Sequence, residues 1–341
     1  MAVPFKTLES ITRNYIIPTV IDQLSVASPL MERILKRKKG LTGMKVEQPV
    51  EFAYNPLAGA WQGGYAVLPF QTPEIITKAQ HDYAYYQCPV VWAETDVLKN
   101  AGAEAIADYA EVITKNARKS MMETFGRDLY KDGSVNALGA RTIDGLSAIC
   151  TYNGNPAPGA YGGIDRSSST GTRASYTNNA WWNAQVVAVN AGSVARWQGT
   201  FNFSNASTVI DMRKMNQFML MFPEPPDAFY TSFPLFGKLW DLNQANEKIE
   251  RSNGGDKYDV GARKIFINGI PVFPDILIDN ENKIYGISHD EITLRVSKDF
   301  EAGKMKNPTR QRIVGTHIFF DGQLTCGQPQ MQGLMTGATA Q

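Results

Sequence analysis

The chain has 341 residues, of which 43% are hydrophobic and 20% charged, and its formal net charge is +1. This apolar content with so little net charge excludes global disorder, and the length is enough to bury a sizeable core. The near-zero net charge also argues against a protein that binds nucleic acid through a large excess of positive charge. No apolar run is long enough to predict a membrane-spanning helix, and the first residues lack the pattern of a secretory signal.

The first predicted element is a short amphipathic helix within an N-terminal arm, residues 1–44. Its apolar residues Leu30, Ile34 and Leu35 recur at helical spacing, and Gly40 stops it. A basic cluster ends the arm and consists of Arg33, Lys36, Arg37, Lys38 and Lys39. This cluster is either a solvated face or a contact, made to phosphate or to an acidic neighbouring subunit.

An alternating strand follows, with Val46, Val50 and Phe52 on one side. A second alternating segment, residues 83–92, is its predicted partner in a hairpin. Between them, residues 52–73 carry no charge but hold the large apolar side chains Leu57, Trp61, Tyr65, Val67, Leu68 and Phe70. Leu57, Trp61, Tyr65 and Phe70 are the candidate contact residues. Charge depletion and aromatic enrichment mark interface centres. We therefore expect this loop to be covered, either by the chain's own domain or by another copy of the chain.

A long amphipathic helix is predicted over residues 95–130, where it would act as a scaffold. Residues 151–204 show no clear periodicity and contain Trp181-Trp182, so they are predicted to be irregular and to lie against a partner or serve a function.

The last third is typical of an α+β lobe. A capping sequence predicts a helix from Thr208 to about Met221, and Ser232 precedes a second helix. Asn268-Gly269 between two apolar runs predicts a two-residue hairpin. Strands are expected near residues 292–296 and 313–320, and the stretch after Asp321 is an uncharged tail.

A search for chemistry predicts no catalytic, cofactor-binding or metal-binding residues, and so no enzyme. The chain has no phosphate-binding loop, no dinucleotide-binding glycine motif, no HExxH zinc motif and no EF-hand loop. Ser288-His289-Asp290 cannot form a triad, because adjacent side chains do not converge. Cys88, Cys150 and Cys326 lie far apart, which predicts three buried free thiols in a reducing cytosol.

Several short sequences, in order along the chain, resemble one branch of the major capsid proteins of tailed bacteriophages, which have the Hong Kong 97 fold. They are SPLMERILK at 28–36, YQCPVVW at 86–92 leading into LKNAG at 98–102, FGRDLYKDG at 125–133, IDGL at 143–146 and YGGIDRS at 161–167 with Trp181-Trp182. No one of these motifs is decisive, but together they run in the same order along the chain. The order of arm, hairpin, long helix, irregular stretch and α+β lobe is also similar to that family.

The resemblance implies an α+β shell subunit with an N-terminal arm, residues 1–44, and an extended β-hairpin loop, residues 45–92. A peripheral domain with a spine helix would span 93–150, an irregular inter-domain segment 151–204, an axial domain 205–289, and a return to the peripheral domain with a C-terminal tail 290–341. It implies self-assembly into pentamers and hexamers that form an icosahedral head around double-stranded DNA, which the shell holds without sequence specificity. The resemblance also implies scaffolding, portal and decoration proteins as partners. It does not imply an interaction with a membrane. The chain would be made in the host cytoplasm and end in the virion.

Two departures from the family pattern matter. In some members an isopeptide bond from a lysine on the extended loop links neighbouring subunits. Residues 52–73 contain no lysine here, so a shell without covalent links between subunits is predicted. No acidic leader precedes the arm, which predicts a separate scaffold or none. The alternatives are an encapsulin-type compartment shell around protein cargo, and a soluble hydrolase or carbohydrate-binding module that uses Trp181-Trp182.

Overall fold

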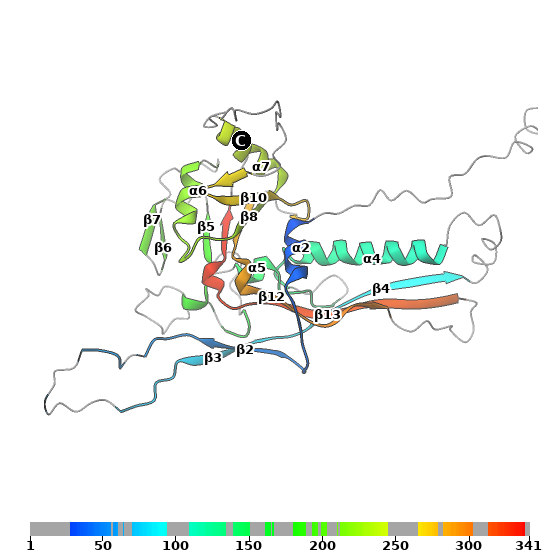
Figure 1. Cartoon of the computed structure of the whole chain (residues 1–341), viewed down its shortest axis with the longest axis horizontal. Coiled ribbons are helices and arrows are strands. Elements are labelled where there is room, and N and C mark those ends of the chain that lie inside the picture. The colour runs from blue at the N-terminus through cyan, green and yellow to red at the C-terminus, as the bar shows by residue number, and fades with distance from the viewer. Residues whose placement is uncertain are drawn as a thin grey trace, which may run out of the picture. The chain divides into compact units, whose positions relative to one another are not determined.

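The computed structural model describes residues 28–55, 57–60, 64, 70–93, 109–133, 139–150, 161–164, 166, 180–188, 193–196, 199–202, 210, 212–244, 265–278, 282–302 and 313–337. These residues form a mixed α+β fold, as predicted (Figure 1). The chain divides into two compact units. The larger comprises residues 27–85, 123–299 and 320–341, and the smaller comprises 1–26, 86–122 and 300–319. No described helix is long and apolar enough to cross a membrane.

A six-stranded sheet is the centre of the larger unit, with the strand order β5-β14-β11-β8-β10-β9. The strands are β5 (Gln185–Ala188), β14 (Gly333–Thr336), β11 (Lys283–Ile287), β8 (Ala228–Thr231), β10 (Ile270–Pro274) and β9 (Ile265–Ile267). Strand β14 runs parallel to β5 and antiparallel to β11. The uncharged stretch after Asp321 therefore contributes a strand inside the sheet, and part of the stretch predicted to be irregular forms its edge strand β5.

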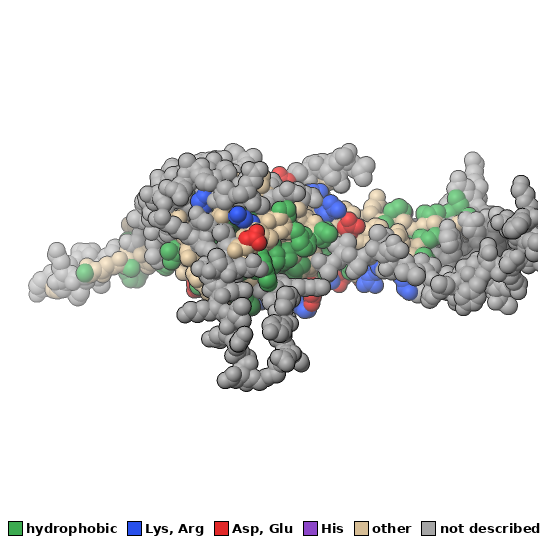
Figure 2. All heavy atoms as spheres, turned by 90° about the horizontal axis from the view of Figure 1, so that it is seen from above, with side chains coloured by type: hydrophobic (Ala, Val, Ile, Leu, Met, Phe, Trp, Pro, Cys, Tyr) green, Lys and Arg blue, Asp and Glu red, His purple; other side chains and the backbone are tan. Residues whose placement is uncertain are grey.

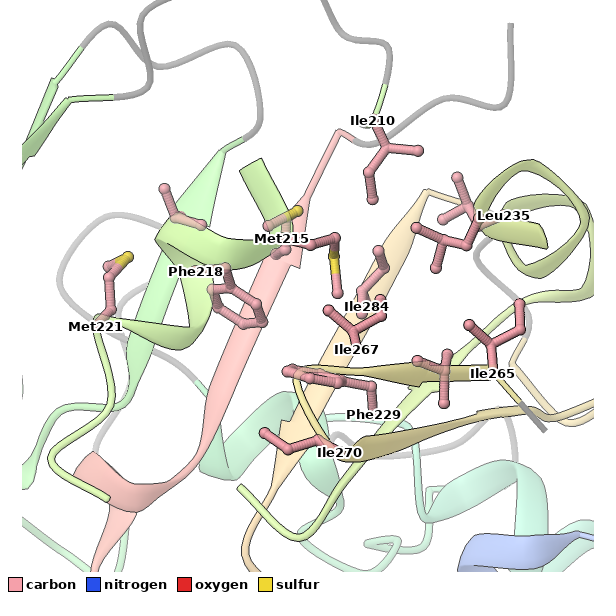
Figure 3. Packing of buried hydrophobic residues seen from close by; sticks show 14 of the residues in the cluster. Ile210, Met215, Phe218, Met221, Phe229, Leu235, Ile265, Ile267, Ile270 and Ile284 are labelled. Atoms are coloured by element: carbon pink, nitrogen blue, oxygen red, sulfur yellow. The ribbon is translucent and has the colours of Figure 1, made fainter. Parts of the chain in front are cut away.

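Two helices cover one face of this sheet, namely α6 (Met212–Met219) and α7 (Phe233–Gln244). Their inward side chains meet those of the strands in one apolar cluster, in which Met215 and Phe218 of α6 lie over Ile284 and Ile267 (Figure 3). Each large apolar side chain buried in this way contributes about 1.5–3 kcal/mol. The cluster explains why both helices, which the sequence predicted, are stable in this position.

Two facing glycines make room for this cluster. Gly286 of β11 pairs with Gly333 of β14, and a Cβ atom at either position would collide with the ring of Phe222. The turn between β9 and β10 also follows the prediction. Asn268 and Gly269 have φ of 50° and 84°, the left-handed values of a type I′ turn.

The four-stranded sheet has the order β1-β12-β13-β4, from β1 (Lys38–Gly40), β12 (Ile292–Ala302), β13 (Ile313–Cys326) and β4 (Ala84–Ala93). β4 alternates as predicted, since Ala84 and Val90 are buried while Tyr85 and Val91 are exposed. The predicted pairing of this strand with the strand that begins at Val46 was wrong. The strand β2 (Val46–Glu51) pairs instead with β3 (Ile76–His81), a segment between the two predicted strands. Alternation marks a strand but does not specify the strand with which it pairs.

The long helix is present as α4 (Tyr109–Asp128), while the predicted part from residue 95 to 108 lies outside the described residues. Its buried row is Ala117, Met121 and Phe125. The arm helix is α2 (Pro29–Lys36), capped by the side chain of Ser28. The remaining elements are α5 (Leu146–Ile149), the short helices η2 (Ala180–Trp182), η3 (His289–Glu291) and η4 (Pro329–Met331), and the hairpin of β6 (Ser193–Arg196) and β7 (Gly199–Asn202).

Candidate functional site

The β2–β3 hairpin carries the predicted contact residues. Phe70 is fully exposed and Leu57 is half-buried, whereas Trp61 and Tyr65 lie outside the described residues. Tyr54, near the start of the uncharged loop, and Ile76, the first residue of β3, are also exposed, at 69% and 60%. Aromatic and aliphatic surface on both branches is thus open to solvent in the single chain.

Buried side chains hold the base of the hairpin. Val46, Val50, Ala79 and His81 are all buried on one face of the β2–β3 pair. The backbone amide of Gln80 donates a 2.7 Å hydrogen bond to the carbonyl oxygen of Gly162. A rigid base with an exposed apolar far part is a geometry that suits contact with a second surface.

The tryptophan pair helps to form this base. Trp182 is 1% exposed and its Nε1 donates to the carbonyl oxygen of Tyr161 at 2.8 Å. The ring of Trp181 lies 5.7 Å from that of Phe52, which directly follows β2. Both indoles therefore pack within the chain, and this geometry argues against an open platform for stacking a sugar.

A polar network joins the end of β3 to the loop before α5. Nδ1 of His81 lies 3.4 Å from Oδ2 of Asp144, and both side chains are buried. Arg141 donates to both oxygens of Asp144, at 2.9 and 3.1 Å, and to Oδ2 of Asp82 at 3.2 Å. Arg141 and Asp144 lie three residues apart, but the contacts to His81 and Asp82 span 63 and 59 positions, so sequence reasoning could not find those two.

Arg166 is a second feature that the sequence did not reveal. Its side chain is fully buried, and its Nη1 donates to the carbonyl oxygens of Ala148 and Ile149 at 2.9 and 3.2 Å. The guanidinium also lies 4.8 Å from the ring centroid of Tyr161. Burial lowers the pKa of Arg166 to about 10. Arg166 thus caps the C-terminal end of α5 and links the segment around Tyr161 to that helix.

The basic cluster is largely paired within the chain. Lys36 donates to Glu32 at 2.6 Å, Lys38 to Asp299 at 2.6 Å, and Arg37 to Asp290 at 2.5 Å. Arg33 lies over the ring of Phe273, and Lys39 is exposed. Three of the five cations are therefore engaged with acidic residues of the same molecule.

The described residues contain no group that could hold a metal ion. Ser288 makes backbone hydrogen bonds with the side-chain amide of Gln332, and Asp290 binds Arg37, so neither meets the ring of His289 as a triad requires. Cys150 and Cys326 are buried, and burial raises the pKa of Cys326 to about 12. Cys88 is only partly buried, contrary to the prediction, because the outer strand β4 leaves it half-covered.

The surface charge is mixed. On the face seen from above, hydrophobic side chains gather near the centre, with basic and acidic side chains around them (Figure 2). Neither sign of charge dominates the described part of this face, in agreement with the net charge of +1.

No family model and no curated protein matches the sequence. Solved structures match it over nearly its full length. The chain is similar to a subunit of the cyanophage A-1(L) capsid asymmetric unit, with a TM-score of 0.71 and 14% identity, covering 99% of this chain and 100% of that one.

Two further structures widen the comparison. The capsid of the native GTA particle gives a TM-score of 0.62 at 10% identity, covering 97% and 96% of the two chains. The holo-SrpI encapsulin of Synechococcus elongatus PCC 7942 gives 0.55 at 10% identity, covering 100% and 97%. The chain therefore has the mixed α+β fold of the Hong Kong 97-type shell proteins, which the resemblance in its sequence predicted.

Proposed function

We propose that this chain is the major capsid protein of a tailed bacteriophage. Its copies assemble into hexamers and pentamers that form an icosahedral head, and the head encloses double-stranded DNA without reading its sequence. The observation that carries the proposal is the likeness to a subunit of a cyanophage capsid over 99% of this chain. The shell fold thus accounts for almost the entire sequence.

In this proposal, residues 45–92 form the extended loop, 93–150 the peripheral domain with the spine helix, 205–289 the axial domain and 290–341 the return to the peripheral domain. The exposed Phe70, with Leu57, Trp61 and Tyr65, contacts a neighbouring copy. Exposed apolar surface of this kind is costly in water and is stabilised when a partner covers it. Head-to-tail contacts between identical copies close into rings and shells.

The partners proposed besides the chain itself are scaffolding, portal and decoration proteins and the packaged genome, and the place of function is the virion. Near-zero net charge supports a container that encloses nucleic acid rather than one that binds it tightly.

An encapsulin-type shell is the second candidate, because the same fold occurs in an encapsulin with a TM-score of 0.55. The segment 161–167 and the higher similarity to a phage capsid favour the first candidate. The two differ in what the particle contains, which is DNA in one case and protein cargo in the other.

Negative-stain microscopy and light scattering of the purified chain, alone and with its phage's scaffold, test the proposal. Shells, tubes or discrete hexamers and pentamers are expected. Nuclease-treated native particles that retain double-stranded DNA support the capsid, whereas particles filled with a single enzyme support the encapsulin. A chain that stays monomeric at high concentration and with its scaffold contradicts both.

A further inference from the structure

The arm helix α2 reaches the loop around η3 through Arg37, which follows the helix directly. Nη1 of Arg37 donates to the backbone carbonyl of His289 at 2.8 Å, and Nη2 donates to Oδ1 of Asp290 at 2.5 Å. One guanidinium thus joins two consecutive residues that lie more than 250 positions away along the chain. Because the two donors of the guanidinium contact two different acceptors, the contact fixes the orientation of Arg37 as well as its distance from the loop.

The residue that Arg37 contacts is itself held on three sides. The OH of Tyr230 lies 2.7 Å from Nε2 of His289, and Oδ2 of Asp227 lies 2.7 Å from its backbone nitrogen and 3.3 Å from Nδ1. These partners assign a neutral ring, in which Nδ1–H donates to Asp227 and Nε2 accepts from Tyr230. His289 is 5% exposed. Both ring nitrogens are therefore occupied in the neutral form.

A second cation of α2 lies at the same place. The guanidinium of Arg33 is 4.6 Å from the ring centroid of Phe273, and that ring stacks on Tyr230 at 5.9 Å. Arg33 therefore rests against Phe273, and Phe273 stacks on the tyrosine that contacts His289. A proton on the imidazole would face two arginines, with Asp227, Asp290 and Glu291 as the acidic groups nearby.

We propose that Arg33 and Arg37 are positioning residues that fasten the arm helix to this part of the six-stranded sheet, and that protonation of His289 releases the fastening. Arg37 donates to the backbone carbonyl of His289, and Tyr230 and Asp227 hold the ring of that same residue. A displacement of His289 therefore moves the carbonyl oxygen away from Arg37. Docking of the C-terminal end of the arm helix is then favoured while the imidazole is neutral and weakens when the ring is protonated.

The sign of the pH effect follows from the burial of the ring. Burial first, and then Arg33, lower the pKa of His289 from 6.5 to about 4, against the opposing effect of Asp227. The docked state therefore binds fewer protons than a state in which the ring is in water. Docking is fully favoured above about pH 6.5 and weakens as the pH falls towards 4. At pH 5 these two pKa values weaken docking by at most about 30-fold.

Hydrogen–deuterium exchange of the full, unassembled chain tests the proposal. Exchange over residues 29–37 is compared with that over α7 at pH 7.5 and 5.0, after correction for the intrinsic pH dependence of exchange. In the wild type, protection of α2 should fall several-fold more than that of α7. In His289→Gln, which keeps an acceptor for Tyr230 but does not titrate in this range, the additional fall should disappear.

Variants of Arg37 and of its partner Asp290 complete the test. Arg37→Gln and the exposed Asp290→Asn should lower protection of α2 several-fold at both pH values, and Arg37→Lys should recover part of it. Lys39→Gln, which removes an exposed charge from the same basic cluster, is the matched control and should change nothing. Protection of α7 reports in every sample whether the variant is folded.

Unchanged protection of α2 in both Arg37→Gln and Asp290→Asn would overturn the fastening. A fall at pH 5 that persists in His289→Gln would overturn the role of the imidazole. The measurement does not require a shell, so its outcome is independent of the function proposed above. The meaning of the fastening for assembly, namely the direction in which the arm leaves the subunit, does rest on that function.

Discussion

Tyr130 donates a 2.7 Å hydrogen bond to the carboxylate of Asp275, which lies 145 positions later in the chain and is 1% exposed. The same oxygen accepts from Oγ of Ser28, the residue that caps α2, and the other oxygen accepts from the backbone amide of Leu277. One buried carboxylate therefore joins the start of the arm helix, the end of the long helix and the exit of β10. Burial, reinforced by Asp275, raises the pKa of Tyr130 well above its ordinary value.

Replacing this carboxylate should therefore be costly. Asp275→Ala leaves three buried donors without an acceptor and should lower the free energy of unfolding by about 3 kcal/mol or more. Tyr130→Phe removes one bond only and should cost about 1.5 kcal/mol. Urea denaturation of the unassembled chain measures both. An Asp275→Ala variant as stable as Tyr130→Phe would show that Asp275 does not connect the three elements.

Gly145, which precedes α5, should not tolerate a side chain. A Cβ atom there would lie 2.5 Å from the carbonyl oxygen of Asp128 and would also collide with that of Leu129. Because backbone atoms cannot move aside as side chains do, Gly145→Ala should lower the free energy of unfolding by about 3 kcal/mol.

The matched control for this change lies inside α7. A Cβ atom at Gly237 would have no neighbour within 4 Å. Alanine is preferred over glycine in a helix, so Gly237→Ala should raise the free energy of unfolding by about 0.5–1 kcal/mol. Opposite signs in the same denaturation experiment are expected, and equal effects would contradict the packing at Gly145.

Phe70, exposed on the branch of the loop that leads into β3, should matter for assembly and not for folding. Phe70 touches solvent over its whole side chain, so Phe70→Ala should change the stability of the subunit by less than about 0.5 kcal/mol. Assembly should fall at least several-fold, as measured by light scattering against protein concentration. Gln71→Ala, an exposed polar neighbour, is the control. Normal shells from Phe70→Ala would remove this residue from the proposed contact.

The shell should be held together without covalent bonds between subunits. Residues 52–73 contain no lysine, so the extended loop offers no amine at its far part. Mature particles boiled in detergent should give a single band at the subunit mass of 37.7 kDa. A ladder of multiples of that mass would contradict the prediction.

Elements whose cause is local were predictable. The left-handed turn at Asn268-Gly269 needs only the two residues that form it. α7 was predictable because Leu235 and Leu239 recur at helical spacing, and both are buried in the core. The strands β12 and β13 also lie where the sequence predicted strands, although both extend further than predicted.

Elements whose cause is a distant partner were missed or wrongly paired. Residues 76–81 and 84–93 are both strands, and only the three-dimensional arrangement decides that the first pairs with β2 while the second lies beside β13. The sequence predicts a tail where β14 lies, because four residues carry little periodicity, yet this strand pairs with β5 on one side and β11 on the other. Strand pairing is non-local, and its register depends on which faces are buried.

Four properties could be predicted from the sequence alone: the lack of recognisable catalytic motifs, the α+β class, the uncharged hairpin loop and the resemblance to capsid proteins. These follow from composition, periodicity and the order of short motifs. Only the tertiary structure decided what the basic residues contact, since Arg37 meets Asp290 and Lys38 meets Asp299 across more than 250 positions. It alone also decided that Arg166 is buried against the carbonyl oxygens of Ala148 and Ile149. A charged side chain finds its partner through the folded arrangement of the backbone, and spacing along the chain contains no information about a partner that distant.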